Sequence, residues 1–272
     1  MNVFISADIE GIGGVMDAMH QEPGNPAYKL ACEWMTGEVN AAVEGAIQGG
    51  AGRVVVKDSH NTGMNIDLAK LHPAAELISG WGPLRSMVEG IDETFDALFL
   101  IGYHARGMTL GATLAHMWSS HVLDLRINGQ PVGEAAWAAA FAGHFNVPVA
   151  MITGDDKLIA QVTQELPPGF LHVQTKTGMA FHAARMRPIP IVREEIRQTA
   201  ARAMAQIKTL SPYKPALPAT ITLRFRHWEG LDACAAVPTV ERLSVDTFQF
   251  RAADFIEAQK GFATLHRLAR PA

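Results

Sequence analysis

Short apolar runs alternate with segments of helical periodicity through the first 166 residues of this chain. Runs fit for buried strands occupy residues 3–5, 53–56, 95–102 and 147–153, with a weaker one at 75–80. Residues 27–48, 134–143 and 157–166 instead have helical character. This alternation favours a mostly parallel sheet with helices on both faces. We therefore predict an α/β fold with a three-layer α/β/α domain over residues 1–166.

The remaining residues, 167–272, differ in their content of proline and in the length of their predicted elements. Seven prolines between residues 167 and 218 separate shorter elements. Residues 191–207 form an amphipathic pattern, 219–226 alternate as a one-sided strand, and 243–250 alternate with a phase slip typical of a bulge. The last helix carries an apolar stripe from Phe255 to Ala269. We predict a smaller, two-layer α+β subdomain here.

The composition of the chain argues against several classes of binding partner. The net charge is −4 and no cluster of Lys and Arg occurs, which argues against nucleic acid or an anionic membrane as the partner. Cys32 and Cys234 are far apart, so neither a thiolate metal site nor a disulfide is expected. The chain enters its first strand directly and has no apolar run long enough for a membrane span. We expect a cytoplasmic protein acting on a small molecule.

Polar side chains follow several of the predicted strands. Asp8 and Glu10 lie two residues apart after the first strand, so both carboxylates point to the same side of extended chain. Such a pair resists ionisation unless a cation or a shared proton lies between them. His60 and His104 follow two further strands, and the carboxyl ends of parallel strands gather functional groups at one edge. Taken alone, Asp8 and Glu10 also fit a solvated turn.

Two further residues lie in the middle of the chain. Glu134 falls in the first turn of a predicted helix, where the helix dipole alone favours a carboxylate. His116 lies in a polar loop between His104 and that helix. Two His and three carboxylates suit two divalent ions with one bridging carboxylate, and zinc fits such a set without thiolate. The other eight histidines have no acidic companion at ligand spacing and are expected to be surface or packing residues.

Seven short segments resemble those of the binuclear zinc D-aminopeptidases associated with dipeptide transport. They are SADIEG at residues 6–11, DSH at 58–60, LHP at 71–73, SMVEG at 86–90, GYHAR at 102–106, INGQPVGE at 127–134 and GDD at 154–156. The resemblance covers the chain to about Asp156 and continues more weakly to the C-terminal helix. Its specificity comes from several motifs in the same order.

The resemblance implies a function and an assembly. It implies six site residues: Asp8 as a ligand bridging two zinc ions, Glu10 and His60 completing one site, His104 and Glu134 completing the other, and His116 as the catalytic histidine. The implied reaction is hydrolysis of N-terminal D-residues from short peptides and amides through a metal-bridged water. Family members form stacked rings, so a homo-oligomer, a homodecamer, is expected. One departure is the loop from Arg106 to His116, which is a residue longer and lacks the family's usual proline.

Three other functions remain open from the residues. A binuclear amidohydrolase acting on a non-peptide amide would use the same ligands. A dinucleotide-binding protein is suggested by Gly11, Gly13 and Gly14 after a strand, although no helix follows at once and the third glycine is out of place. A non-catalytic peptide-binding protein would leave the ligand set unexplained. The sequence does not disclose the natural substrate or its chirality.

Overall fold

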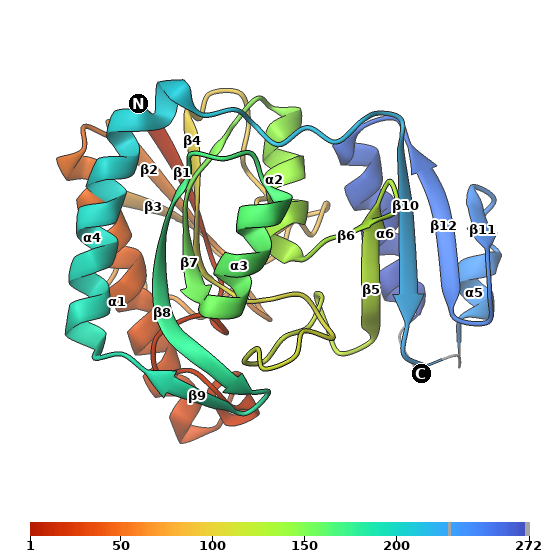
Figure 1. The fold of residues 1–272 in the computed structure, drawn as a ribbon, viewed down its shortest axis with the longest axis horizontal. Coiled ribbons are helices and arrows are strands. Elements are labelled where there is room, and N and C mark those ends of the chain that lie inside the picture. The colour runs from red at the N-terminus through yellow and green to blue at the C-terminus, as the bar shows by residue number, and fades with distance from the viewer. Residues whose placement is uncertain (228–229, 270–272) are drawn as a thin grey trace.

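A computed structural model describes residues 1–227 and 230–269, and within them two sheets lie side by side (Figure 1). The large sheet has the strand order β3-β2-β1-β4-β7-β8-β9. Its strands are β1 (Asn2–Ala7), β2 (Arg53–Asp58), β3 (Ala75–Ile78), β4 (Ala97–Tyr103), β7 (Val149–Asp155), β8 (Leu171–Ala180) and β9 (Ala183–Met186). Neighbouring strands run parallel except β8 and β9, which form an antiparallel hairpin.

Helices cover both faces of the large sheet. On one face α1 (Pro26–Gln48) packs against α4 (Ile189–Gln206), and on the other lie α2 (Glu134–His144) and α3 (Asp156–Glu165) (Figure 1). Strand β1 shows why both faces need cover, because Val3 and Ile5 belong to the core under α1 while Phe4 belongs to the core under α2. The predicted three-layer α/β/α arrangement is confirmed.

The small sheet is antiparallel, with the order β11-β12-β10-β5-β6. Its strands are β5 (Val122–Ile127), β6 (Gln130–Pro131), β10 (Ala219–Phe225), β11 (Val240–Arg242) and β12 (Thr247–Ala252). Side chains of β10 alternate between buried and more exposed, and α6 (Phe255–Leu268) packs on β12 and α2. The remaining short elements are η1 (Ala18–His20), η2 (Ile207–Thr209) and α5 (Asp232–Ala235).

The two sheets do not divide the chain at residue 166, where we predicted a boundary. Strands β5 and β6 precede that position but belong to the small sheet, whereas β8, β9 and α4 follow it and complete the large-sheet layers. One apolar cluster runs from Leu98 through Phe141 to Phe250, so both sheets share a core. Local periodicity does not reveal this shared core, because strand pairs such as Leu125 with Leu223 join distant parts of the chain.

One predicted element is also wrong. Residues 243–250 were expected to form one bulged strand, but 243–246 are the turn that joins β11 to β12. Ser244 and Asp246 hydrogen-bond each other in this turn, and such local side-chain bonds compete with strand pairing. Asn128 and Gly129, both with positive φ, form the hairpin turn between β5 and β6.

The order of the strands creates a crevice at the carboxyl edge of the large sheet. From β1 the chain moves outward to β2 and β3, and it then returns to the other side of β1 to form β4. Such a switch point leaves a gap beyond the strand ends, where ligands of α/β folds bind. Asp8 follows β1 and His104 follows β4, so both lie at this gap. No helix among the described residues is long and apolar enough to cross a membrane.

Candidate metal centre

The structure brings all six predicted site residues together. They form three overlapping groups whose candidate ligand atoms lie within 4.8 Å of one another: Asp8 with Glu10 and His60, Asp8 with His104 and Glu134, and Glu10 with His104 and His116. Five of the residues are buried, and 24% of the His116 side chain is exposed. The loops after β1, β2 and β4 and the first turn of α2 therefore converge on one point.

Asp8 lies at the centre of the group. Its Oδ1 atom is 3.2 Å from His60 Nδ1, whereas its Oδ2 atom is 3.5 Å from His104 Nε2. Glu10 Oε2 is 3.2 Å from the same His60 nitrogen, and Glu134 Oε1 is 3.4 Å from the same His104 nitrogen. The two oxygens of one carboxylate thus face two separate histidine–glutamate pairs.

His104 provides a test of whether a metal ion fits. Its Nδ1 atom donates a hydrogen bond to the carbonyl of Ala105 at 2.9 Å, so the lone pair of the neutral ring is on Nε2. Nε2 is buried without a hydrogen-bond partner and faces the acceptor oxygens of Asp8 and Glu134. Lone pairs that face one another in this way require a proton or a cation between them. A divalent cation satisfies all three groups.

The pKa values of Asp8 and His60 indicate the same need for a proton or a cation in this group. Burial raises the pKa of Asp8 well above its usual range, and the charge of Glu10 raises it further. Burial alone would lower the pKa of His60, but the carboxylates of Glu10 and Asp8 outweigh it and hold that pKa well above its usual range. Without a cation the group therefore retains protons, which divalent ions would displace.

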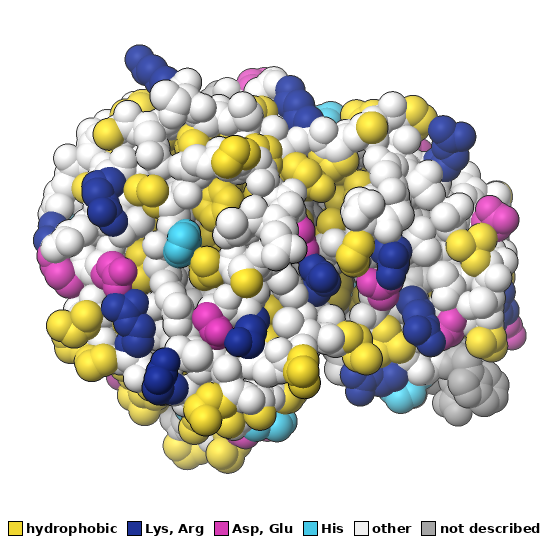
Figure 2. Space-filling view, viewed as in Figure 1, with side chains coloured by type: hydrophobic (Ala, Val, Ile, Leu, Met, Phe, Trp, Pro, Cys, Tyr) yellow, Lys and Arg dark blue, Asp and Glu magenta, His cyan; other side chains and the backbone are white. Residues whose placement is uncertain are grey.

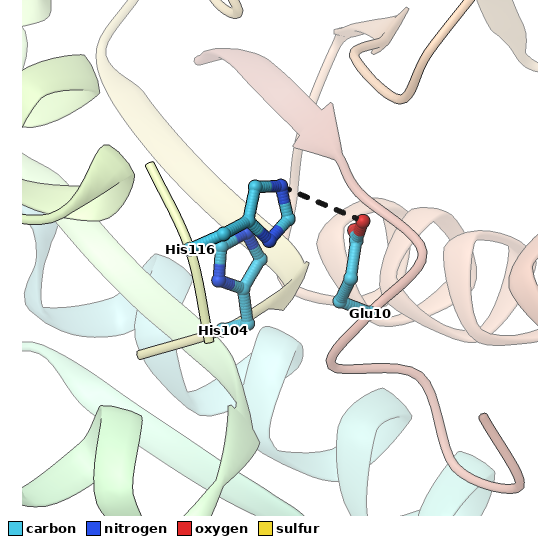
Figure 3. Close-up of side chains that lie close together, drawn as sticks. All are labelled: Glu10, His104 and His116. Carbon is cyan, nitrogen blue, oxygen red and sulfur yellow. Dashed lines mark ion pairs between the residues drawn. The ribbon is translucent and has the colours of Figure 1, made fainter. Parts of the chain in front are cut away.

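His116 lies against this group but differs from its other members. Its ring stacks on that of His104 with 4.2 Å between centroids, and Figure 3 shows its free nitrogen directed at Glu10. The Nδ1 atom donates to the carbonyl of Leu114 at 2.8 Å, and Nε2 lies 3.9 Å from Glu10 Oε1. Burial lowers the pKa of His116, and His104 lowers it further, so its ring is neutral near pH 7.

Two glycines allow the exits of β1 and β4 to approach each other. Gly11 donates its N–H to the carbonyl of Gly102 at 2.8 Å, and a Cβ atom on Gly11 would lie 1.9 Å from the carbonyl oxygen of Tyr103. Gly102 has φ of +71°, a conformation that glycine adopts without strain. Gly11 is therefore required for close contact between two backbone segments. In a dinucleotide-binding loop a helix follows the glycines at once, whereas here the next helix that covers the large sheet begins only at Pro26.

Sequence reasoning missed two buried residues that hold the Glu10 loop. Lys176 of β8 donates hydrogen bonds to three backbone carbonyls, those of Glu10, Ile12 and Val15. Glu38 of α1 accepts the N–H of Gly13 at 2.8 Å. No pattern in the sequence marks Lys176, because its strand was not predicted.

A cavity of 410 Å³ opens beside the group. Its lining includes Asp8, Glu10, His60, His116 and Glu134 on the acidic side, and Trp81, Trp118 and Phe181 among its apolar walls. The main-chain N–H of Trp118 donates to Glu134 Oε1 at 2.5 Å, which ties the loop after His116 to the first turn of α2. The arrangement can hold one or two cations beside space for a small organic substrate.

Comparison with known proteins identifies the family of this chain. A family model for D-aminopeptidases matches residues 1–264. The chain belongs to the D-aminopeptidase family. A D-aminopeptidase of Bacillus subtilis strain 168 is 32% identical over 270 residues, which cover 99% of this chain and 98% of the relative. The family predicted from the sequence motifs is confirmed.

One solved structure extends the comparison to the fold. The structure of DppA from Bacillus subtilis, described as a Zn-dependent D-aminopeptidase and a self-compartmentalizing protease, matches with a TM-score of 0.94 at 31% identity. The match covers 99% of this D-aminopeptidase family member and 98% of DppA. Both sheets, and not only the metal-site layers, therefore belong to the shared fold, and the chain is a hydrolase of this family.

Proposed function

We propose that this protein is a zinc-dependent aminopeptidase that releases N-terminal D-residues from short peptides and amides, with two Zn²⁺ ions per chain. The observation that carries the proposal is the placement of Asp8, whose two oxygens face separate histidine–glutamate pairs. Membership of the D-aminopeptidase family supports the reaction, and the zinc dependence of DppA supports the choice of metal.

The ligand assignment follows the distances. Asp8 would be shared by both ions, Glu10 and His60 would complete one site, and His104 and Glu134 would complete the other. Imidazole and carboxylate without thiolate suit zinc, and a bridging carboxylate is a common feature of two-metal sites. The buried atoms without partners, Nε2 of His104 and Oε2 of Glu10, would each gain a cation to bind.

Zinc ions and the side chains of the protein would contribute different parts of the mechanism. Bound zinc supplies Lewis acidity and lowers the pKa of water at the site. In hydrolysis a bond forms between the water oxygen and the carbonyl carbon, the C–N bond breaks, and the leaving amine takes up a proton. His116 is suited to move that proton, because its neutral ring faces the cavity beside Glu10 and its Nδ1 bond to Leu114 fixes its orientation. The cavity of 410 Å³ offers room for a short peptide beside these residues.

Assays with matched substrates test the reaction and its stereochemistry. We expect D-alanyl amides and dipeptides with a free amino terminus to be cleaved faster than their L-counterparts and faster than the same compounds after acetylation, because only a free amine can bind a metal beside the carbonyl. Acetylated substrates cleaved as fast as free ones would refute an aminopeptidase. A clear L-preference would refute the D-specificity.

We also propose a homo-oligomer, a ring assembly of ten subunits. Support comes from the self-compartmentalizing DppA structure and from exposed apolar side chains at one end of this molecule. Met179 and Phe181 of the β8–β9 hairpin are exposed there, and Figure 2 shows hydrophobic side chains gathered around this hairpin. Phe181 also lines the cavity, so a subunit seated on the hairpin would enclose the site. Light scattering that gives the 29.4 kDa mass of a single chain would contradict the assembly.

A further inference from the structure

Residues 104–121 connect β4 to β5 and carry both His104 and His116. The structure describes this connection throughout, and it contains no helix and no strand. The ring of His116 is oriented by its Nδ1–H, which donates to the carbonyl of Leu114 at 2.8 Å. The direction of Nε2, the nitrogen that points at Glu10 in Figure 3, therefore depends on what fixes the Leu114 carbonyl.

Two backbone hydrogen bonds hold the chain around this carbonyl. The N–H of Leu114 donates to the carbonyl of Phe181, in the turn between β8 and β9, at 3.0 Å. The N–H of Thr113 donates to Oδ2 of Asp155 at 3.0 Å. Leu114 has φ of +53°, a conformation that a non-glycine residue keeps only where its surroundings impose it. These two bonds can impose it.

Asp155 joins the His116 connection to the rigid part of the large-sheet layers. It ends β7 and caps α3, and only 1% of it is exposed. Its Oδ1 atom accepts the N–H of Leu158 at 2.8 Å, which is the ordinary bond of a helix cap, while Oδ2 is left to accept Thr113. The next residue, Asp156, accepts the N–H of Gly178 at 2.7 Å and so holds the β8–β9 hairpin from the same side.

We infer that Asp155 is a positioning residue for His116, acting through the backbone of Thr113 and Leu114. The inference rests on the proposed role of His116 in proton transfer. A group that moves a proton is effective only when its ring is held in the productive orientation, and displacement by about 1 Å can cost a hundredfold in rate. Asp155 supplies that support from a strand end, although it lines no part of the cavity and is no candidate ligand.

A second route from Asp155 leads to the candidate metal site instead of to His116. The negative charge of Asp155 acts on Lys176, whose ammonium group bonds the carbonyl of Glu10. If this route were the important one, loss of Asp155 would release zinc from the Glu10 side of the site. We expect the zinc content of an Asp155 variant to equal that of the wild type, and a loss of zinc by elemental analysis would overturn the positioning role.

Replacement by serine separates the cap from the support of His116. Serine is itself a good helix cap, so Asp155→Ser keeps a partner for Leu158 but removes the second oxygen, which accepts Thr113. Asp254→Ser is the matched control, because Asp254 caps α6 with the same bond, from the N–H of Glu257 at 2.8 Å. Urea titration checks that both variants fold. If Asp155→Ser does not fold, Asp155→Thr replaces it, because threonine also caps helices and is closer to aspartate in volume.

A double-mutant cycle with His116→Ala measures the coupling, with D-alanyl-D-alanine as substrate of the zinc-loaded proteins. We expect Asp155→Ser to lower kcat about tenfold or more and to change KM less than about twofold, because the ring of His116 is displaced while the substrate still binds. In the His116→Ala background the same replacement should change kcat less than about twofold. Asp254→Ser should leave kcat unchanged. Equal losses in both backgrounds, or no loss in either, would overturn the inference.

Nitrogen NMR of the histidine side chains gives a readout that needs no turnover. The signals of His116 are those missing from the spectrum of His116→Ala. We expect the zinc-loaded wild type and Asp254→Ser to show the tautomer with the proton on Nδ1, and Asp155→Ser to show a mixture of both tautomers, because the Leu114 carbonyl is no longer held. An unchanged tautomer in Asp155→Ser would overturn the positioning role. Absence of turnover by the zinc-loaded wild type would instead contradict the proposed function, and the tautomer comparison would still test Asp155.

Discussion

At the scale of single residues, the charge of Asp8 organises the candidate site. Its carboxylate is buried, its pKa is raised by burial, and one of its oxygens lies near His60 while the other lies near His104. A buried carboxylate in this position is costly without cations, so its presence is explained by the ions it would bridge.

Replacing Asp8 tests the bridging role. We expect Asp8→Ala to lose both zinc ions, because both sites share this ligand, and His60→Ala to weaken mainly one site. Elemental analysis of the purified variants measures this difference. Two retained ions per chain in Asp8→Ala would show that the bridging assignment is wrong.

The affinity for zinc should depend on pH. In the metal-free protein, burial lowers the pKa of His104, but Glu134, Glu10 and Asp8 outweigh burial and raise it to about 10. His104 and His60 therefore hold protons at neutral pH, and zinc must displace them. The affinity should rise as pH increases from 6 to 8, by up to about tenfold per unit for each displaced proton. Calorimetry in buffers of different ionisation enthalpy measures the released protons, and an affinity independent of pH would contradict the assignment.

His116 should affect turnover without holding metal. Its nitrogen lies 3.8 Å or more from the glutamate oxygens, farther than those of His60 and His104 from their partners. We expect His116→Ala to lower kcat about a hundredfold or more, because a group that moves a proton is lost, while the zinc content stays the same. Steady-state rates and elemental analysis on one preparation check both halves. Normal turnover in the variant would exclude the role.

The sequence predicts part of this site for clear reasons. Asp8, His60 and His104 follow apolar strands, so the rule that functional groups gather at strand ends finds them. Glu134 has no such mark, since a carboxylate in a first helical turn is common, and the family resemblance is what assigns it to one of the two metal sites.

At the scale of elements, strand β8 holds the loop that contains Glu10. Lys176 lies in the middle of this strand, fully buried, and its ammonium group bonds the carbonyls that precede and follow the Gly11 turn. Burial lowers the pKa of Lys176 to about 8, while nearby carboxylates, Asp155 first among them, oppose that effect. This lysine both shapes the Glu10 loop and offsets part of the negative charge around it.

Lys176→Met should loosen the Glu10 loop selectively. Loss of the ammonium group leaves buried carbonyls without donors, at about 1–3 kcal/mol each, so the unfolding free energy should fall. Zinc at the Glu10–His60 site should weaken more than zinc at the His104–Glu134 site. Urea titration and metal analysis measure the two effects, with Lys157→Met, a surface lysine paired with Asp156, as control. Unchanged metal binding would mean that Lys176 only supports the fold.

Elements with strong periodicity were predicted well, and the others were not. Helix α1 was expected at 27–48 and runs from Pro26 to Gln48, because apolar residues recur at helical spacing and Gly49 ends it. Strands β8 and β9 were missed, since their polar residues and Gly178 weaken any alternation. Their position is set by pairing with β7, a contact that local sequence does not specify.

At the scale of the whole molecule, the two sheets form one unit around the cavity. The loops at the end of the large sheet supply most of the candidate ligands. Helix α6 supports the cavity wall through Gln259, which donates to the carbonyl of Leu84, and through Phe262, whose ring centre lies 5.2 Å from that of Trp118. From the sequence we predicted the layered architecture of both units correctly, but we placed a boundary between them at residue 166, where the two sheets do not separate. Because both sheets share one core, the small sheet belongs to the same unit as the candidate metal centre, and α6 contacts Trp118 of the cavity wall.

We propose that hydrolysis by this protein depends on two zinc ions held at the Asp8 site. The most direct measurement is a zinc titration of the chelator-treated protein, with the rate of D-alanyl-D-alanine cleavage recorded at each step. Two sites that share Asp8 predict no activity without metal and a rate that rises until two ions per chain are bound. Full activity in the metal-free protein, or a maximum reached at one ion per chain, would contradict a two-zinc site.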